Sequence, residues 1–170
     1  MTTFFAVSAG AAATLVGLLF VAVQIGPPLV SSGPIGRRHA MARSTFTVFG
    51  VIFGLSLYFL APGASLKARA TAAIIASAAG AIRAVRTWLP VWQDKLEGRI
   101  EFRLWQTAWL LLGPVIAYAY LIARATAQLN SADPNILIDT SAGVFIVLFA
   151  IGLRNSWNLL VEATVVKSGS

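Results

Sequence analysis

Long apolar stretches recur along this chain, and they limit its fold more than any other feature. The clearest is residues 136–153, ILIDTSAGVFIVLFAIGL, and four other long apolar segments precede it. Runs of about 18 or more apolar residues with few charges are typical of membrane-spanning helices. These runs lack the strict alternation of barrel strands, and a helix satisfies its own backbone hydrogen bonds in lipid. The sequence therefore predicts an all-α integral membrane protein.

The composition leaves no room for a separate soluble domain. Of the 170 residues, 58% are hydrophobic and only 11% are charged, whereas a soluble domain typically has about 25% charged residues. We therefore expect one transmembrane domain over residues 1–170, with the lipid bilayer as its main partner. The net charge of +7 is interpreted as the cytoplasmic excess of Lys and Arg, not as a nucleic-acid surface.

Glycine and proline divide the chain into five expected helices. The predicted bounds are 4–25, 44–60, 67–87, 102–124 and 134–166. The first helix should end at Gly26-Pro27-Pro28, because consecutive prolines remove amide donors and disfavour the helical conformation before them. Ala61-Pro62-Gly63 predicts a tight hairpin, after which Ser65 can cap the third helix. Asp133 and Pro134 form a good N-cap and N1 pair for the last helix.

The third helix is the weakest of the five. Its uncharged part, residues 70–82, is about 20 Å long, so it spans the bilayer only if the flanking Lys and Arg side chains snorkel. A short or re-entrant helix remains the alternative. Residues 88–101 mix tryptophans with alternating charges, which is typical of an interfacial segment. Tyr118 and Tyr120 in the fourth helix are expected to belong to the same aromatic belts.

The distribution of positive charge predicts the topology. Ten of the 13 Lys and Arg residues fall on one side of the expected five spans. The positive-inside rule then places the N-terminus outside and the C-terminus in the cytoplasm. The preference for Arg over Lys and the abundance of Ala are typical of a high-GC bacterium, so we expect the bacterial inner membrane.

Small residues at helical spacing mark faces where helices can pack closely. The candidate packing positions are Gly10, Gly17, Gly50, Gly54, Ala76 and Gly80. Gly50 and Gly54 form a GxxxG motif. Gly113 and Pro114 stand in the middle of the fourth helix and predict a kink there.

The polar inner end of the last helix is the strongest functional candidate in the sequence. Arg154, Asn158 and Glu162 follow one helical face, with Asn155 beside them, and Gln24 lies at similar depth in the first helix. Charge inside the bilayer is costly, so the stripe should face protein or water. It either lines an aqueous path, or serves structure, with Arg154 snorkelling to headgroups and Gln24 hydrogen-bonding within the bundle.

Enzyme signatures are absent from the sequence. The chain has no cysteine and one histidine, His39, in an expected loop. It contains no HExxH, GxSxG or P-loop motif, and no pair of carboxylates at metal-ligand spacing within a span. We therefore expect neither an enzyme nor a cofactor or metal site.

The two ends of the chain carry a resemblance. Residues 4–25 read FFAVSAGAAATLVGLLFVAVQI, and the last helix contains RNSWNLL. This resembles small bacterial multi-pass membrane proteins that open with Phe-Phe, continue Ala-Gly-Ala-Ala, and end with Arg-x-x-Trp-x-Leu-Leu. The resemblance implies the same fold class and brings no functional residues.

Three functions follow as hypotheses from these features. The first is a homo-oligomeric channel or pore for small ions, with the inner end of the last helix lining the path, because one small protomer has little room for a solvated path. The second is a non-transporting membrane subunit that binds or regulates another membrane protein. The third is a small-solute transporter, although five helices do not divide into two equal repeats.

Overall fold

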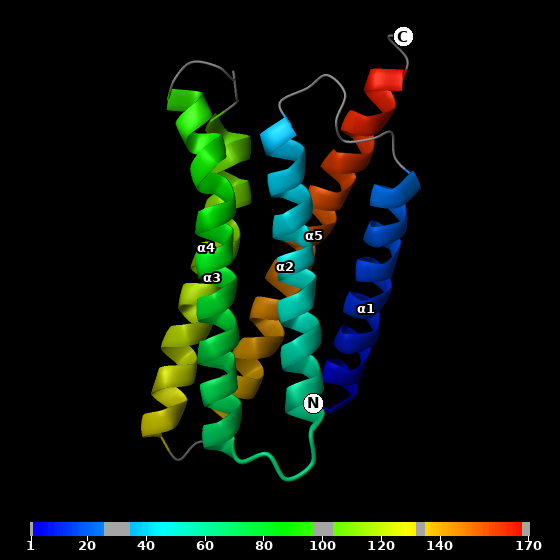
Figure 1. The fold of residues 1–170 in the computed structure, drawn as a ribbon. Coiled ribbons are helices and arrows are strands. Elements are labelled where there is room, and N and C mark those ends of the chain that lie inside the picture. The colour runs from blue at the N-terminus through cyan, green and yellow to red at the C-terminus, as the bar shows by residue number, and fades with distance from the viewer. Residues whose placement is uncertain (1, 26–34, 97–103, 132–134, 168–170) are drawn as a thin grey trace.

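The computed structural model describes residues 2–25, 35–96, 104–131 and 135–167, with most of their side chains. It contains five α-helices that run alternately up and down (Figure 1). They are α1 (Thr2–Ile25), α2 (Ile35–Leu60), α3 (Leu66–Leu96), α4 (Leu104–Asn130) and α5 (Asn135–Lys167). The prediction of an all-α chain with five helices is therefore confirmed.

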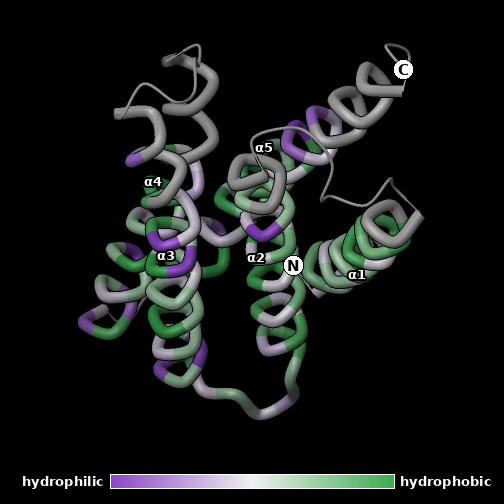
Figure 2. Tube along the Cα trace, turned by 45° about the horizontal axis from the view of Figure 1, so that its top comes forward, coloured by the Kyte–Doolittle hydropathy of each residue, from purple (hydrophilic) through white to green (hydrophobic). Residues whose placement is uncertain are grey.

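Four of the helices are long and apolar enough to cross a membrane. The qualifying stretches in the described part of the chain are Thr2–Val21, Ala40–Leu60, Leu66–Leu89 and Ile136–Asn158. The side chains of α4 are described only from Leu112 onwards. Hydrophilic segments gather towards the helix ends, while the middle of the bundle is mostly apolar (Figure 2).

The helices form a ring of four with α1 outside it. In the ring, α2 packs on α3, α3 on α4, α4 on α5, and α5 returns to α2. The first helix packs mainly on α2 and touches α5 only slightly. The second helix, which contacts α1, α3 and α5, has the largest buried share of its membrane-crossing stretch, 50%. The interior of the ring is filled by large side chains, among them Phe49, Phe145 and Leu148, none of which is exposed.

The helix bounds differ from the predicted ones in three places. The second helix begins at Ile35, so Arg37, Arg38 and His39, expected in a loop, lie in its first turns. Arginine, alanine and methionine are good helix formers, and the sequence after Gly36 contains no further breaker before Gly50.

The third helix was expected to end at residue 87 and is instead continuous through residue 96, with 31 residues. The alternative of a short third helix is therefore wrong, and Leu66–Leu89 is long and apolar enough to cross a membrane. Trp88, expected in an interfacial belt, is 2% exposed. The helix therefore continues past its apolar part, and Trp88 is buried within the bundle. Residues 97–101 of the expected interfacial segment lie outside the described residues.

The fourth helix was expected to end at residue 124 and runs to Asn130. Hydrogen bonds hold its last turns against the start of α5. The Leu137 amide donates to Gln128 Oε1 at 3.1 Å, and Arg124 Nε donates to Thr140 Oγ1 at 3.2 Å. The predicted cap at Asp133 and Pro134 lies outside the described residues.

The predicted hairpin between α2 and α3 is confirmed. Gly63 has φ of 78°, a left-handed conformation that glycine adopts without strain. The Ala68 amide donates to Ser65 Oγ at 3.2 Å, so Ser65 caps α3 as expected. We call this end of the bundle the turn end, and the opposite end, where α2 begins and α3 ends, the arginine end.

Candidate functional site

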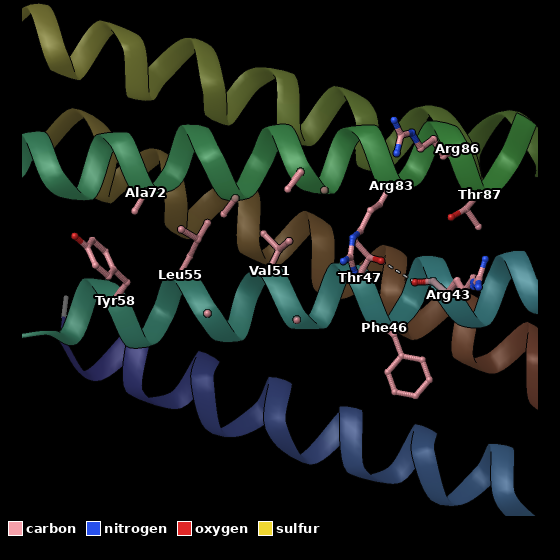
Figure 3. A pocket seen from close by; sticks show the side chains of 15 residues that line it. Arg43, Phe46, Thr47, Val51, Leu55, Tyr58, Ala72, Arg83, Arg86 and Thr87 are labelled. Atoms are coloured by element: carbon pink, nitrogen blue, oxygen red, sulfur yellow. Dashed lines mark hydrogen bonds between the residues drawn. The ribbon is translucent and has the colours of Figure 1, made fainter.

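A groove of about 880 Å³ runs along the outside of the bundle between α2 and α3. Its lining joins three arginines, two threonines, small residues and a few larger apolar side chains. They are Arg43, Phe46, Thr47, Gly50, Val51, Gly54, Leu55, Tyr58, Ala72, Ala76, Ala79, Gly80, Arg83, Arg86 and Thr87. Figure 3 shows α2 and α3 side by side along the groove, with Tyr58 at one extreme and the arginines at the other.

The groove forms because residues along it have no side chain or only a methyl group. A Cβ added to Gly50 or Gly54 would meet nothing within 4 Å. The facing surface of α3 carries Ala72, Ala76 and Ala79, whose side chains are single methyl groups. The turn at residues 61–65 fixes the two helices close together at one end. The small residues therefore leave a groove that no side chain of the described structure fills.

The arginine end of the groove is cationic. Arg43, Arg83 and Arg86 are all exposed, and no acidic residue lines the groove in the described part of the chain. Arg83 extends from α3 towards α2 at the level of Thr47 (Figure 3). The hydroxyl of Thr47 donates to the Arg43 carbonyl at 2.9 Å, so its proton is already used within α2.

Arg43 on α2 and Arg83 on α3 lie at the same distance from the turn end. Arg43 is 17 residues from Leu60, and Arg83 is 17 residues from Leu66, at the turn ends of their helices. At 1.5 Å per residue, both are about 25 Å from the turn end. Arg86 is nearly one turn further, at about 30 Å. These distances are comparable to the thickness of the hydrocarbon core of a bilayer, about 30 Å.

The inner end of α5, where the sequence predicts a site, is divided between two faces. Arg154 is exposed, Asn155 is completely buried and Asn158 is half-buried. Trp157, 67% exposed, lies on the outside with Arg154. Arg154 and Asn155 therefore point in different directions. The side chains of Glu162 and Gln24 lie outside the described part of the structure, so the continuation of the stripe stays a prediction.

Asn155 is the least satisfied polar group in the described bundle. Neither its amide nitrogen nor its carbonyl oxygen has a hydrogen-bond partner among the described residues. A buried polar group without a partner costs about 1–3 kcal/mol. Such a group in a native protein calls for a water, an ion or another residue to complete it.

The candidate packing positions divide into two kinds. Gly80 lies against the ring of Tyr118, where an added Cβ would be only 2.8 Å from Cζ, and Ala76 packs at the edge of the core. Gly10 and Gly17 on α1 face open space, as do the two groove glycines. Among the described residues, the GxxxG motif therefore brings no other helix into contact. Tyr118 is fully buried, so its assignment to an aromatic belt is wrong, while Tyr120 is exposed.

The predicted kink site lies in an unbroken stretch of helix. Pro114 is inside α4, and a Cβ added to Gly113 would be 2.9 Å from Cδ1 of Ile151. Gly113 therefore allows α5 to approach α4. A second, mostly apolar groove of about 550 Å³ lies between these helices. Asp139 lines it, and it is the one acid whose side chain the structure describes.

Comparison of the chain with models of protein families, with curated proteins and with solved structures finds no match. In the described residues, no group of three or more His, Asp and Glu side chains could hold a metal ion. The α2–α3 groove and the inner end of α5 are the two candidate sites of the described structure. Sequence reasoning missed the groove because it assigned Arg43 to a loop and treated Gly50 and Gly54 as packing positions.

Proposed function

We propose that the protein crosses the bacterial inner membrane five times, with its N-terminus outside and its C-terminus in the cytoplasm. The segregation of Lys and Arg supports this topology. The length of α4 supports the fifth span, since its 27 residues reach about 40 Å at 1.5 Å each. In this orientation the arginine end of the groove lies at the cytoplasmic boundary of the bilayer.

We propose further that the protein is a non-transporting membrane subunit that binds an anionic partner in the α2–α3 groove. The observation that carries this proposal is the cluster of three exposed arginines at one end of an open groove, without an acid among its described lining. A guanidinium is always charged and binds phosphate or carboxylate through two parallel hydrogen bonds. The attraction is stronger at the edge of the bilayer than in bulk water, because the local dielectric is lower. The proposal includes no catalytic step.

Arg83 provides the test of anion recognition. The expected result of Arg83→Gln is roughly 10-fold or more weaker binding of inorganic phosphate, since a hydrogen bond to a charged group contributes about 1.5–3 kcal/mol. Binding is measured as the rise in unfolding temperature of the protein in neutral detergent, at constant ionic strength, with chloride as the reference anion. Lys67→Gln at the turn end is the matched control, because Lys67 is exposed and lies outside the groove. Equal phosphate binding by the wild type and Arg83→Gln would contradict the proposal.

A homo-oligomeric ion channel is the second candidate, and buried Asn155 is the observation that favours it. Its two unpaired side-chain atoms are about 30 Å along α5 from Asn135, close to the exposed Arg154. Water in a hydrated path through the bundle at this level would supply the missing hydrogen bonds. In an assembly of copies, exposed Arg154 would attract small anions to the inner mouths of these paths.

Replacement of Asn155 by leucine distinguishes the two candidates. If Asn155 is enclosed in a dry bundle, Asn155→Leu should raise the free energy of unfolding by about 1–3 kcal/mol, because it removes an unsatisfied buried group of similar size. If Asn155 borders a hydrated path, the same change should abolish anion flux into liposomes. Arg154→Ala tests the charge at the mouth, and Ser156→Ala is the neighbouring control. No flux in the wild type at any voltage would remove the channel candidate.

A further inference from the structure

We infer that the anionic partner in the α2–α3 groove is a glycerophospholipid of the cytoplasmic leaflet, an inference that depends on the proposed anion-binding function. Its phosphate would lie among Arg43, Arg83 and Arg86, and one acyl chain would follow the groove towards Tyr58. The groove has a cationic end and a long apolar part, so it matches the two chemical halves of such a molecule.

The depth of the arginines fits a headgroup. Arg43 and Arg83 lie about 25 Å, and Arg86 about 30 Å, from the turn end of the hairpin. A core about 30 Å thick places the phosphates of one leaflet at this level. Basic pockets between transmembrane helices on the cytoplasmic side are typical binding sites for anionic headgroups. The hydroxyl of half-buried Thr87 has no partner among the described residues, so it can donate to a phosphate oxygen.

The apolar part of the groove fits an acyl chain. Gly54 is 11 residues from Arg43, about 16 Å along the helix, which is close to the thickness of one leaflet, about half of 30 Å. Over this distance the floor is Gly50, Gly54 and Ala76, with Val51 and Leu55 as apolar walls. A free phosphate would use none of this surface. The groove is on the outside of the bundle, so a lipid can enter it sideways from the bilayer.

A transmembrane helix of a partner protein fits the groove less well. A helix would need an acidic residue at the level of the arginines to satisfy their charge, whereas the phosphate of a lipid satisfies it directly. A lipid is therefore the occupant that the charge of the groove favours.

The experiment measures binding of phosphatidylglycerol to the full chain in neutral detergent by native mass spectrometry, with phosphatidylcholine as the uncharged reference lipid. We expect phosphatidylglycerol to bind roughly 10-fold more tightly than phosphatidylcholine, and Arg83→Gln to remove this preference. The substitution Gly54→Leu fills the floor of the groove. It should weaken the binding of phosphatidylglycerol roughly 10-fold or more, because the new side chain occupies the path of the acyl chain. Gly10→Leu is the matched control, since Gly10 also faces open space but lies on α1.

The phosphate assay separates failure of this inference from failure of the proposed function. We expect Gly54→Leu to leave phosphate binding unchanged and to weaken the binding of phosphatidylglycerol. If Gly54→Leu weakens the binding of neither phosphate nor phosphatidylglycerol, the acyl chain does not lie in the groove. The inference is then overturned, while the anion site stands. If Arg83→Gln changes neither phosphate nor lipid binding, both proposals are overturned. Release of a co-purifying protein by Gly54→Leu, with phosphatidylglycerol unaffected, would assign the groove to a partner helix. Gly50→Leu serves as the second floor variant should Gly54→Leu not fold.

Discussion

Replacing Phe5 with alanine should detach the N-terminal half of α1 from the bundle and cost about 3–5 kcal/mol, the usual range for a buried Phe→Ala change. Phe5 is 3% exposed. Its ring meets Phe59 of α2 with centroids 5.0 Å apart and Phe145 of α5 with centroids 6.0 Å apart, both nearly perpendicular. Edge-to-face pairs of this kind add about 0.5–1.5 kcal/mol beyond the area they bury. Because α1 lies outside the ring of four helices, this aromatic contact is a large part of what holds it.

Phe20→Ala is the control for this prediction, since Phe20 is in the same helix but is 57% exposed. Unfolding in mixed micelles of increasing denaturing-detergent fraction measures the loss of stability. A single cysteine at Ala12, which is completely buried, reports the exposure of α1 by its labelling rate. The chain has no native cysteine, so the label is unambiguous. Equal losses for Phe5→Ala and Phe20→Ala would show that lipid contact, and not the aromatic cluster, determines the position of α1.

The helices themselves could be predicted from the sequence because length and breakers decide them. Apolar runs predicted all five, and Ala61-Pro62-Gly63 with Ser65 predicted the one turn that the structure describes. The bounds of α2 were wrong because charge was treated as evidence of a loop. Arginine is a good helix former, and Arg43 lies within α2 with its side chain exposed.

The rotation of each helix could not be predicted, and the functional surfaces depend on it. In water, the apolar face of a helix marks the core, but in lipid the outer face is equally apolar. Nothing in the local sequence of α5 therefore shows that Asn155 points inward and Arg154 outward. Successive residues differ by about 100° around a helix, so a rotation of about 100° would exchange the positions of Arg154 and Asn155.

The groove could not be predicted for a related reason, since it forms where small residues leave space unfilled. Gly50 and Gly54 indicate that something can approach α2, but the sequence does not specify what does. The structure shows that no other helix of the chain fills this space among its described residues. It also brings Arg83 of α3 to the same depth as Arg43 of α2, a correspondence that follows from the position of the turn. The arginine cluster therefore becomes apparent only when the pairing of α2 with α3 is known.

Gly152→Ala should destabilise the protein by about 1–3 kcal/mol, the usual cost of overpacking, although alanine is the better helix former by about 1 kcal/mol. An added Cβ at this position would be 2.6 Å from Cε1 and 2.7 Å from Cζ of Phe49. The Phe49 ring is completely buried and also contacts Phe149, with centroids 6.0 Å apart. It therefore has no free space to move into, and the clash outweighs the gain in helix propensity.

The matched control is Gly143→Ala in the same helix, where an added Cβ meets nothing within 4 Å. There the gain in propensity acts alone, so the free energy of unfolding should rise by up to about 1 kcal/mol. The two substitutions are chemically identical and should have opposite signs. Combining Gly152→Ala with Phe49→Leu should recover part of the loss, because the shorter side chain vacates the position of Cε1 and Cζ. A coupling energy of about 0.5–3 kcal/mol between the two sites would show direct contact. Strict additivity would mean that α2 and α5 are not packed against each other at this level, and the ring of four helices would then be wrong.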